Sequence, residues 1–164
     1  MKYLELNNGF FAKVDDDDFE KFSTYSWTAV KRKSGGYNIT RHFRAKGKST
    51  VVLLPRLIMN CPDGLVVDHV NHDTLDNRKC NLRICSVANN NMNQRKIIKR
   101  TSRYKGVSLR KEKRGLKKWR ACINLDKKRI SLGDYSSEEE AAFAYNKAAK
   151  RYFGEFAYLN HIHA

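Results

Sequence analysis

The stretch that decides the fold runs from Asp68 to Asn90 and reads DHVNHDTLDNRKCNLRICSVANN. It places aspartates, two histidines and a series of asparagines in a loop-like segment of a chain that is otherwise strongly basic. Carboxylate and amide oxygens are the ligands that hard divalent cations prefer, and a histidine is a suitable base near neutral pH. The combination indicates metal-assisted chemistry on a phosphate backbone.

The residues around this stretch predict a strand, a loop, a returning strand and a helix. The apolar residues 65–67 predict a strand that ends at Asp68 and His69, and residues 81–83 predict the returning strand. Ser86 is a suitable cap for a helix that carries Asn89, Asn90 and Asn91. Adjacent residues of a strand point to opposite sides, so Asp68 could face a metal while His69 faces the nucleophile. An asparagine of the helix could point back at Asp68 and complete an oxygen-ligand site.

The chain before this stretch predicts two β-hairpins and two short helices. The hairpins turn at Asn7-Asn8-Gly9 and at Ser34-Gly35-Gly36, and a strand within residues 51–59 passes into a short helix near Pro55. The acidic run 15–18 predicts a helix cap and a solvated turn rather than a metal site. The second hairpin has cationic arms well placed to touch phosphates, with Lys31, Arg32, Lys33, Arg41 and Arg44.

The charge of the chain indicates a polyanionic partner. Lys and Arg number 33 against 17 Asp and Glu, a net charge of +16, and nucleic acid is the leading candidate. No apolar run approaches the roughly 20 residues of a membrane span, so we expect a soluble, intracellular protein. Its four cysteines form no C-x-x-C pair and are predicted to be free thiols rather than zinc ligands.

The C-terminal third has a different pattern. Residues 93–101 predict a basic linker, and three short strands follow within residues 104–135. Ser136 and Ser137 with Glu139 and Glu140 form a capping-box signature for a helix that should end near Gly154. Its predicted apolar stripe is Ala141, Ala144, Tyr145, Ala148 and Tyr152. The fold class is therefore α+β, with domains at residues 1–92 and 102–164.

The central stretch resembles the HNH endonucleases, specifically the phage-type homing endonucleases with a ββα-metal fold. The matching motifs are Val67-Asp68-His69, Asp76-Asn77-Arg78, Asn81-Leu82-Arg83 and Asn89-Asn90-Asn91. The resemblance implies that His69 is the general base and that Asp68 and Asn90 hold Mg²⁺, with Mn²⁺ as the alternative ion. It also implies that Asn81 orders the loop. Asn89 remains an alternative to Asn90, and His72 and Asn77 are expected to support the site.

Residues 102–160 resemble the plant Apetala-two and ethylene-response-factor DNA-binding domain. The matching motifs are Tyr104-Lys105-Gly106-Val107, Lys118-Trp119-Arg120-Ala121, Leu132-Gly133-Asp134-Tyr135, Glu140-Ala141-Ala142, Ala144-Tyr145 and Phe153-Gly154-Glu155-Phe156-Ala157. The resemblance implies that the sheet enters the major groove of DNA. The expected DNA contacts are Arg110, Trp119, Arg120, Arg129, Lys105, Lys118 and Arg95, with a core position as the other reading of Trp119.

We therefore expect a metal-dependent endonuclease that acts on double-stranded DNA, leaves 5′-phosphate and 3′-hydroxyl ends, and is directed by its C-terminal domain. A monomer is favoured, and a phage or prophage is the expected source. The alternatives are a DNA-binding regulator with a silent nuclease portion and a protein that acts on RNA. Metal-dependent nicking of plasmid DNA distinguishes the first alternative, and competition with RNA distinguishes the second.

Overall fold

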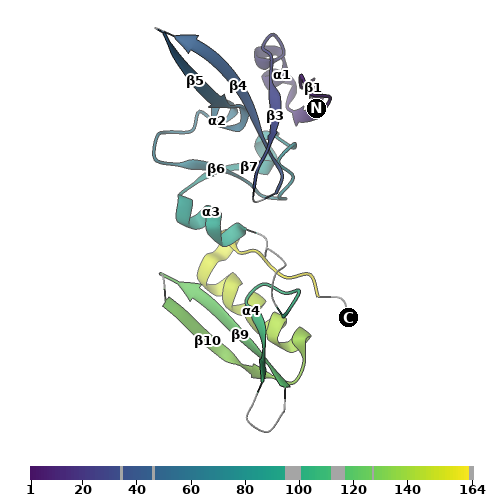
Figure 1. Cartoon of the computed structure of the whole chain (residues 1–164), viewed down its shortest axis with the longest axis vertical. Helices are drawn as coiled ribbons and strands as arrows, with labels where there is room; N and C mark the ends of the chain where they lie inside the picture. Colours follow the sequence, from purple (N-terminus) through teal and green to yellow (C-terminus); the bar gives the residue numbers. More distant parts are fainter. Residues whose placement is uncertain (34, 46, 95–100, 112–116, 127, 163–164) are drawn as a thin grey trace. The chain divides into compact units, whose positions relative to one another are not determined.

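The chain folds into two compact units, Met1–Asn90 and Asn91–Ala164, built from small antiparallel sheets and a few helices (Figure 1). The computed structural model describes all residues except 34, 46, 95–100, 112–116, 127 and 163–164. The α+β class is confirmed. The predicted linker, with Arg95, falls largely on 95–100, outside the described residues. No helix in the described part of the chain is long and apolar enough to span a membrane.

The first unit opens with the two predicted hairpins. Strands β1 (Lys2–Glu5) and β2 (Phe11–Val14) pair antiparallel and are followed by helix α1 (Asp16–Phe22). A three-stranded sheet follows, with β3 (Thr28–Lys31), β4 (Tyr37–Ala45) and β5 (Lys48–Leu53) in that order, and β5 passes directly into helix α2 (Leu54–Ile58). Pro55 lies in the first turn of α2, where its missing N–H costs no hydrogen bond.

The core of this unit lies between the hairpins and α2. The most deeply buried apolar side chains are Leu6, Val14, Trp27, Ile39 and Leu54. Trp27 contributes the largest apolar surface and donates its indole N–H to the Phe22 carbonyl at 3.0 Å, so its one polar atom is satisfied.

The central stretch forms the predicted strand, loop, strand and helix. Strand β6 (Val66–His69) pairs antiparallel with β7 (Leu82–Cys85), after a single turn of 3-10 helix, η1 (Lys79–Asn81), and β7 leads to helix α3 (Val87–Asn93). The Ser86 hydroxyl accepts the Asn89 N–H at 3.2 Å, which confirms the predicted cap. The two-unit division falls inside α3, so its first residues belong to the first unit and its last to the second.

The acidic run has a role that the sequence did not reveal. Helix α1 is confirmed, but no aspartate side chain caps it. Asp15 instead accepts the backbone N–H of Lys79 at 2.8 Å, and the buried Asp18 pairs with the Lys79 ammonium at 2.8 Å. The solvated turn is therefore a wrong prediction, because two of these carboxylates bind the loop before β7.

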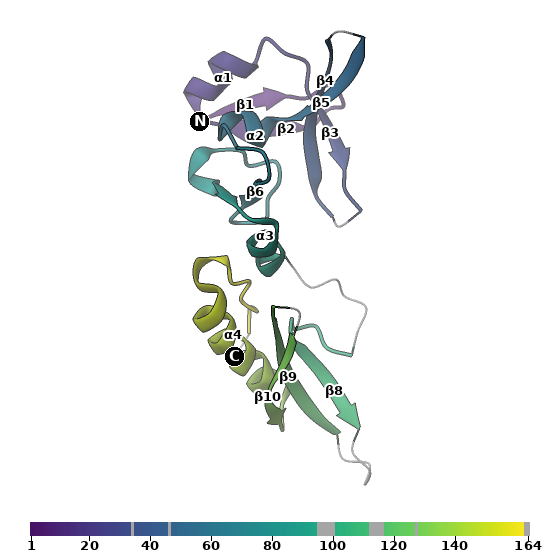
Figure 2. The same ribbon diagram turned by 90° about the vertical axis from the view of Figure 1, so that its left-hand side faces the viewer.

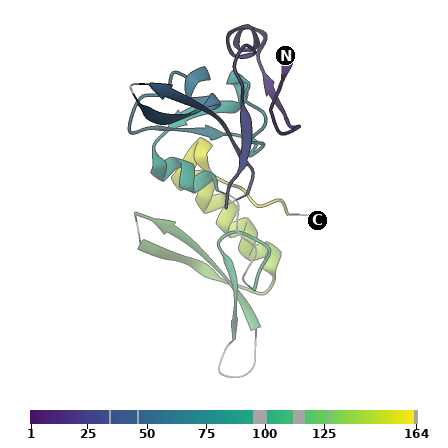
Figure 3. The ribbon, with the colours of Figure 1, turned by 45° about the horizontal axis from the view of Figure 1, so that its top comes forward.

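The second unit is a three-stranded antiparallel sheet packed against one helix (Figures 2 and 3). Its strands are β8 (Val107–Lys111), β9 (Lys117–Leu125) and β10 (Lys128–Tyr135), with β9 in the middle. Helix α4 (Glu138–Phe153) begins with the predicted capping box between Ser137 and Glu140, and Gly154 at its end has a positive φ of 53°. A short 3-10 helix, η2 (Gly154–Phe156), follows.

Helix α4 buries small residues against the sheet. Ala141, Ala142, Tyr145, Ala148, Ala149 and Phe153 are its buried residues. Tyr152, which we placed in the apolar stripe, is 42% exposed, and the neighbouring Phe153 faces the core instead. The prediction for Tyr152 is wrong because two aromatic residues are adjacent in the last helical turn, and the contacts there bury Phe153 and leave Tyr152 exposed.

Gly106, just before β8, permits the closest packing in this unit. Its φ is +77°, and a Cβ there would lie 2.0 Å from Tyr145 Cδ2 and 2.7 Å from the Cys122 carbonyl oxygen. Both the backbone conformation and the contact with α4 therefore require glycine.

Gly106→Ala should lower the free energy of unfolding of the second unit by about 3 kcal/mol or more, because strain and overpacking add. Gly9→Ala is the matched control: its φ is +78°, but nothing lies within 4 Å of the added Cβ, and about 1 kcal/mol is expected. Hydrogen exchange of the amides in each unit measures both values. Equal losses would show that the backbone angle alone makes glycine necessary.

Candidate active site

Asp68 is held inside the β6–β7 hairpin by an ion pair. It lies directly opposite Arg83 in the strand register and is only 6% exposed. Its Oδ2 accepts from Arg83 Nε at 2.9 Å and from Nη2 at 2.7 Å. A carboxylate buried to this degree requires such compensation, and the two bonds from the guanidinium fix its position.

His69 lies beside Asp68 and is oriented by Asn77. Its Nε2 is 3.3 Å from Asn77 Oδ1, while Asn77 Nδ2 donates to the Thr74 carbonyl at 3.3 Å. Because the amide nitrogen is directed at Thr74, the amide oxygen faces the imidazole and Nε2 must carry the proton. The lone pair then resides on Nδ1.

The surroundings of His69 favour the neutral imidazole. Burial lowers its pKa from the usual value, the positive charge of Arg32 lowers it further, and the Asn77 contact and the nearby aspartates Asp68 and Asp73 oppose these effects. A histidine that is neutral at physiological pH can accept a proton, which is the first requirement of a general base.

The loop between β6 and β7 is closed by the Asn81 side chain. Asn81 Nδ2 donates to the Asp76 carbonyl at 2.7 Å, and Asn81 Oδ1 accepts the Asn71 N–H at 3.0 Å. Asp76 is buried in turn and forms a two-point ion pair with Arg78, at 2.8 and 2.6 Å. These bonds give a segment without regular structure a defined shape.

The same loop is fixed to the N-terminal hairpins. Lys13 of β2 donates its N–H to the Leu75 carbonyl at 2.8 Å and accepts the Asn77 N–H at 2.7 Å. The Tyr37 N–H of β4 donates to Thr74 Oγ1 at 2.8 Å. These hydrogen bonds between the hairpins and the loop could not be predicted from the sequence, because no local signal marks Lys13 or Thr74. The one available signal was the run of polar residues in the loop, several of which are buried.

Asn90 and His72 border this centre. Asn90 lies in α3, where its backbone N–H bonds to the Ser86 carbonyl at 3.0 Å and also interacts with the Cys85 thiol. Burial, with the Asp68 charge second, raises the pKa of that thiol, so Asp68 and Asn90 are both neighbours of Cys85. His72 occupies a turn with a positive φ of 64° and donates its N–H to the His69 carbonyl at 3.1 Å.

The donors present suit a hard cation that keeps part of its water. Among the residues that the structure describes, no three His, Cys, Asp or Glu side chains gather as a metal cluster. One carboxylate from Asp68 and one amide oxygen from Asn90 or Asn89 fit Mg²⁺, which typically binds one or two protein oxygens and completes its shell with water and substrate phosphate. They do not fit a structural zinc site, and all four cysteines are free, as predicted.

The second unit gathers cations on the face of its sheet that is opposite α4. In the strand register, Ser108, Arg120 and Asp134 lie side by side across the three strands. Asp134 accepts two hydrogen bonds from Arg120, both at 2.7 Å, and one from Arg110 at 3.2 Å. The bonds from Arg120 lower the pKa of Asp134 to about 2, so these guanidinium groups are held in fixed orientations at neutral pH.

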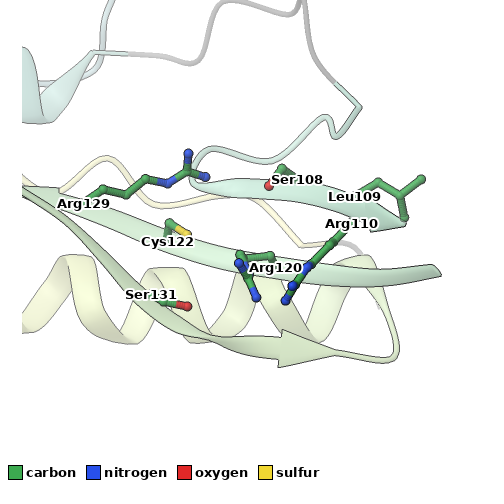
Figure 4. Close-up of a pocket in the computed structure, with 7 residues that line it drawn as sticks. All are labelled: Ser108, Leu109, Arg110, Arg120, Cys122, Arg129 and Ser131. Atoms are coloured by element: carbon green, nitrogen blue, oxygen red, sulfur yellow. The ribbon is translucent and has the colours of Figure 1, made fainter. Parts of the chain in front are cut away.

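Figure 4 shows an open hollow on this face, with Arg129 at one end and Arg110 and Arg120 at the other. The residues that line it are Ser108, Leu109, Arg110, Arg120, Cys122, Arg129 and Ser131. Lys118 is exposed next to Arg110 in the strand register. Four of the predicted DNA contacts therefore share one face.

The other predicted contacts lie elsewhere. Trp119 alternates with Arg120 along β9, so it lies on the α4 side of the sheet, where it is partly buried against the cluster with Tyr104 and Ala141 rather than part of the cationic face. Lys105 donates its ammonium to the carbonyls of Met92 and Gln94 at 2.7 and 2.8 Å, and burial lowers its pKa to about 8. The Lys105 ammonium therefore already donates to two carbonyl oxygens, which leaves fewer of its N–H groups to bind a phosphate.

Arg83→Met should destabilise the first unit by about 3 kcal/mol, because it removes the cation that compensates the buried Asp68 carboxylate. A divalent ion at Asp68 would restore part of this loss. Millimolar Mn²⁺ should therefore raise the melting temperature of Arg83→Met by more than that of the wild type, as thermal unfolding with and without EDTA would show. An equal response in both proteins would contradict a metal site at Asp68.

Comparison with known proteins agrees with this geometry. Residues 60–92, which contain β6, the loop, β7 and most of α3, match the family model described as HNH endonuclease. The chain is 28% identical over 159 residues to an uncharacterised HNH endonuclease of Acanthamoeba polyphaga mimivirus, an alignment that covers 97% of this chain and 79% of the relative. No solved structure matches it. Residues 60–92 are therefore similar to the HNH endonucleases, and the chain is an enzyme of the nuclease class.

Proposed function

We propose that this protein is a metal-dependent DNA endonuclease of the homing type that hydrolyses phosphodiester bonds to 5′-phosphate and 3′-hydroxyl ends. The observation that carries the proposal is His69, a half-buried imidazole with one defined tautomer beside a buried aspartate, inside the segment that matches the HNH endonucleases. Double-stranded DNA is the proposed substrate, and a monomer acting inside a virus- or phage-infected cell is the proposed setting.

His69 acts as the general base in this proposal. Its Nδ1 lone pair takes a proton from the attacking water as the water oxygen bonds to phosphorus and the bond from phosphorus to the 3′-oxygen breaks. Asn77 holds the imidazole in the reactive tautomer and accepts the Nε2–H, which becomes more acidic as the ring gains charge. Asn81 and His72 shape the loop on which this geometry depends.

Asp68 and Asn90 are the proposed metal ligands. A divalent ion, Mg²⁺ in our proposal, would neutralise charge on the scissile phosphate and on the departing oxygen. Arg83 holds the Asp68 carboxylate in place with two hydrogen bonds, and the Ser86 cap begins the helix that carries Asn90. The only protein charge in this ligand set is one carboxylate, so substrate oxygens remain necessary to complete the shell.

The cationic sheet face is the proposed DNA-targeting surface. Arg110 and Arg120, oriented by Asp134, offer planar donor groups that can bond to phosphates or to guanine edges, and Arg129 and Lys118 add charge on the same face. Pre-orientation lowers the conformational entropy that each arginine loses on binding. Trp119 supports this surface from the core side.

His69→Ala should reduce the rate of plasmid nicking in Mg²⁺ by about 100- to 10 000-fold, the usual contribution of a general base. Binding of the same plasmid in EDTA should be nearly unchanged, because the imidazole is neutral. Gel analysis of nicked and linear products, followed by sequencing of the ends, measures both rate and chemistry. Wild-type protein that binds DNA without metal-dependent nicking would favour the non-cleaving regulator.

Arg129→Ala should weaken binding to duplex DNA and make the dependence of log K on log [salt] shallower by about one unit, the value for one lost phosphate contact. Arg151→Ala is the matched control, since it removes the same charge from an exposed position on α4, on the other side of the sheet. Anisotropy titrations at several salt concentrations compare them. Equal changes would place the DNA elsewhere.

A further inference from the structure

The turn between β3 and β4 reaches the active-site loop. Arg32 closes this turn by donating its backbone N–H to the Gly36 carbonyl at 3.0 Å, and its side-chain Nε bonds to the Gly35 carbonyl at 3.2 Å. One residue later, the Tyr37 N–H donates to Thr74 Oγ1 at 2.8 Å. Thr74 is the residue whose carbonyl fixes the Asn77 amide, so the turn and His69 are joined through two residues.

Gly36 permits a particularly close approach at this point. Its φ is +71°, and an added Cβ would lie 2.8 Å from Thr74 Oγ1 and 3.1 Å from Arg32 Nη2. The Arg32 guanidinium and the Thr74 side chain therefore both lie against Gly36. Thr74 in turn holds the Asn77 amide that contacts His69, so the guanidinium lies against the residues that orient the imidazole.

Arg32 differs from the other arginines around the site. Arg78 and Arg83 are neutralised by Asp76 and Asp68. Within the described part of the chain, no carboxylate forms an ion pair with Arg32, although its side chain is half-buried and burial lowers its pKa. A partly desolvated guanidinium without an acidic partner attracts an anion, and the anion expected beside a nuclease base is a phosphate.

We propose that Arg32 is a phosphate-binding catalytic residue. Its guanidinium contacts the non-bridging oxygens of the phosphodiester that is attacked by the water activated by His69. The assignment rests on the proposed role of His69. Negative charge on these oxygens grows as water adds to phosphorus, and a planar guanidinium that donates two parallel bonds stabilises it. The Gly35 bond and the contact with Gly36 hold the group in place before substrate arrives.

Two substitutions at Arg32 separate charge from shape. Arg32→Gln keeps a donor of moderate length and loses the charge, whereas Arg32→Lys keeps the charge without the planar fork. Lys48→Gln is the matched control, because Lys48 is exposed at the start of β5 and pairs with Ala45, about 20 Å or more along β4 from the β3–β4 turn. It removes an equal charge from the same sheet.

The measurement is the single-turnover nicking rate on plasmid with saturating protein and Mg²⁺, together with plasmid affinity in EDTA. Arg32→Gln should slow nicking by about 100-fold or more, Arg32→Lys should retain at least a tenth of the wild-type rate, and Lys48→Gln should nick at nearly the wild-type rate. Both glutamine variants should lose the same modest affinity. Thermal unfolding verifies that each variant is folded.

The outcomes distinguish this proposal from the proposed function. If the wild type nicks, His69→Ala does not, and Arg32→Gln nicks like Lys48→Gln, the role of Arg32 is wrong and that of His69 stands. If Arg32→Lys is as slow as Arg32→Gln although both are folded, charge is not the contribution and the proposal also fails. A wild type that never nicks would instead overturn the endonuclease proposal itself.

Discussion

The site depends on how the buried side chain of Asn77 is satisfied. An amide excluded from water is costly unless its donors and acceptor find partners. Asn77 gives its backbone N–H to Lys13, its amide N–H to Thr74 and its amide oxygen to His69. One residue thereby joins the first hairpin, the active-site loop and the imidazole. Its hydrogen-bond requirements also select the His69 tautomer. The need to satisfy the buried Asn77 amide therefore determines both the packing of the loop and the position of the imidazole lone pair.

This arrangement gives the N-terminal elements a structural role at the candidate site. The β6–β7 hairpin has only two strands, and such a hairpin is not stable by itself. The loop between its strands is polar, so hydrogen bonds and ion pairs hold it rather than apolar packing. The N-terminal elements provide these partners: the backbone of Lys13, the carboxylates of Asp15 and Asp18, and the N–H of Tyr37. Their apolar faces meanwhile form the core around Trp27 that makes them rigid.

Much of the fold could be predicted because its signals are local. Turn glycines, the Ser86 cap and the Ser137 capping box each act within a few residues, and they located the hairpins, α3 and α4 correctly. The order of Asp68, His69, Asn81 and Asn90 likewise lies in one short stretch. The binding of Lys79 by the acidic run could not be predicted, because it joins residues 64 positions apart. The packing of Trp119 on the α4 side and the exposure of Tyr152 depend on which face of each strand or helix meets the core, and composition alone does not determine that face.

Beyond the net charge of +16, the arginines of the described chain differ in whether a carboxylate is bonded to them, and this difference indicates which of them are suited to bind phosphate. An arginine bonded to a carboxylate has a fixed position and a reduced attraction for phosphate, whereas one without such a partner attracts anions strongly. Arg83 and Arg78 belong to the first kind and maintain the shape of the site. Arg120 and Arg110 are intermediate, since they share one aspartate and retain excess charge on an open sheet face. Arg32 is half-buried on the turn that contacts Thr74 and has no acidic partner in the described chain, which is the arrangement expected if, as we propose, the anion to be bound is the substrate itself.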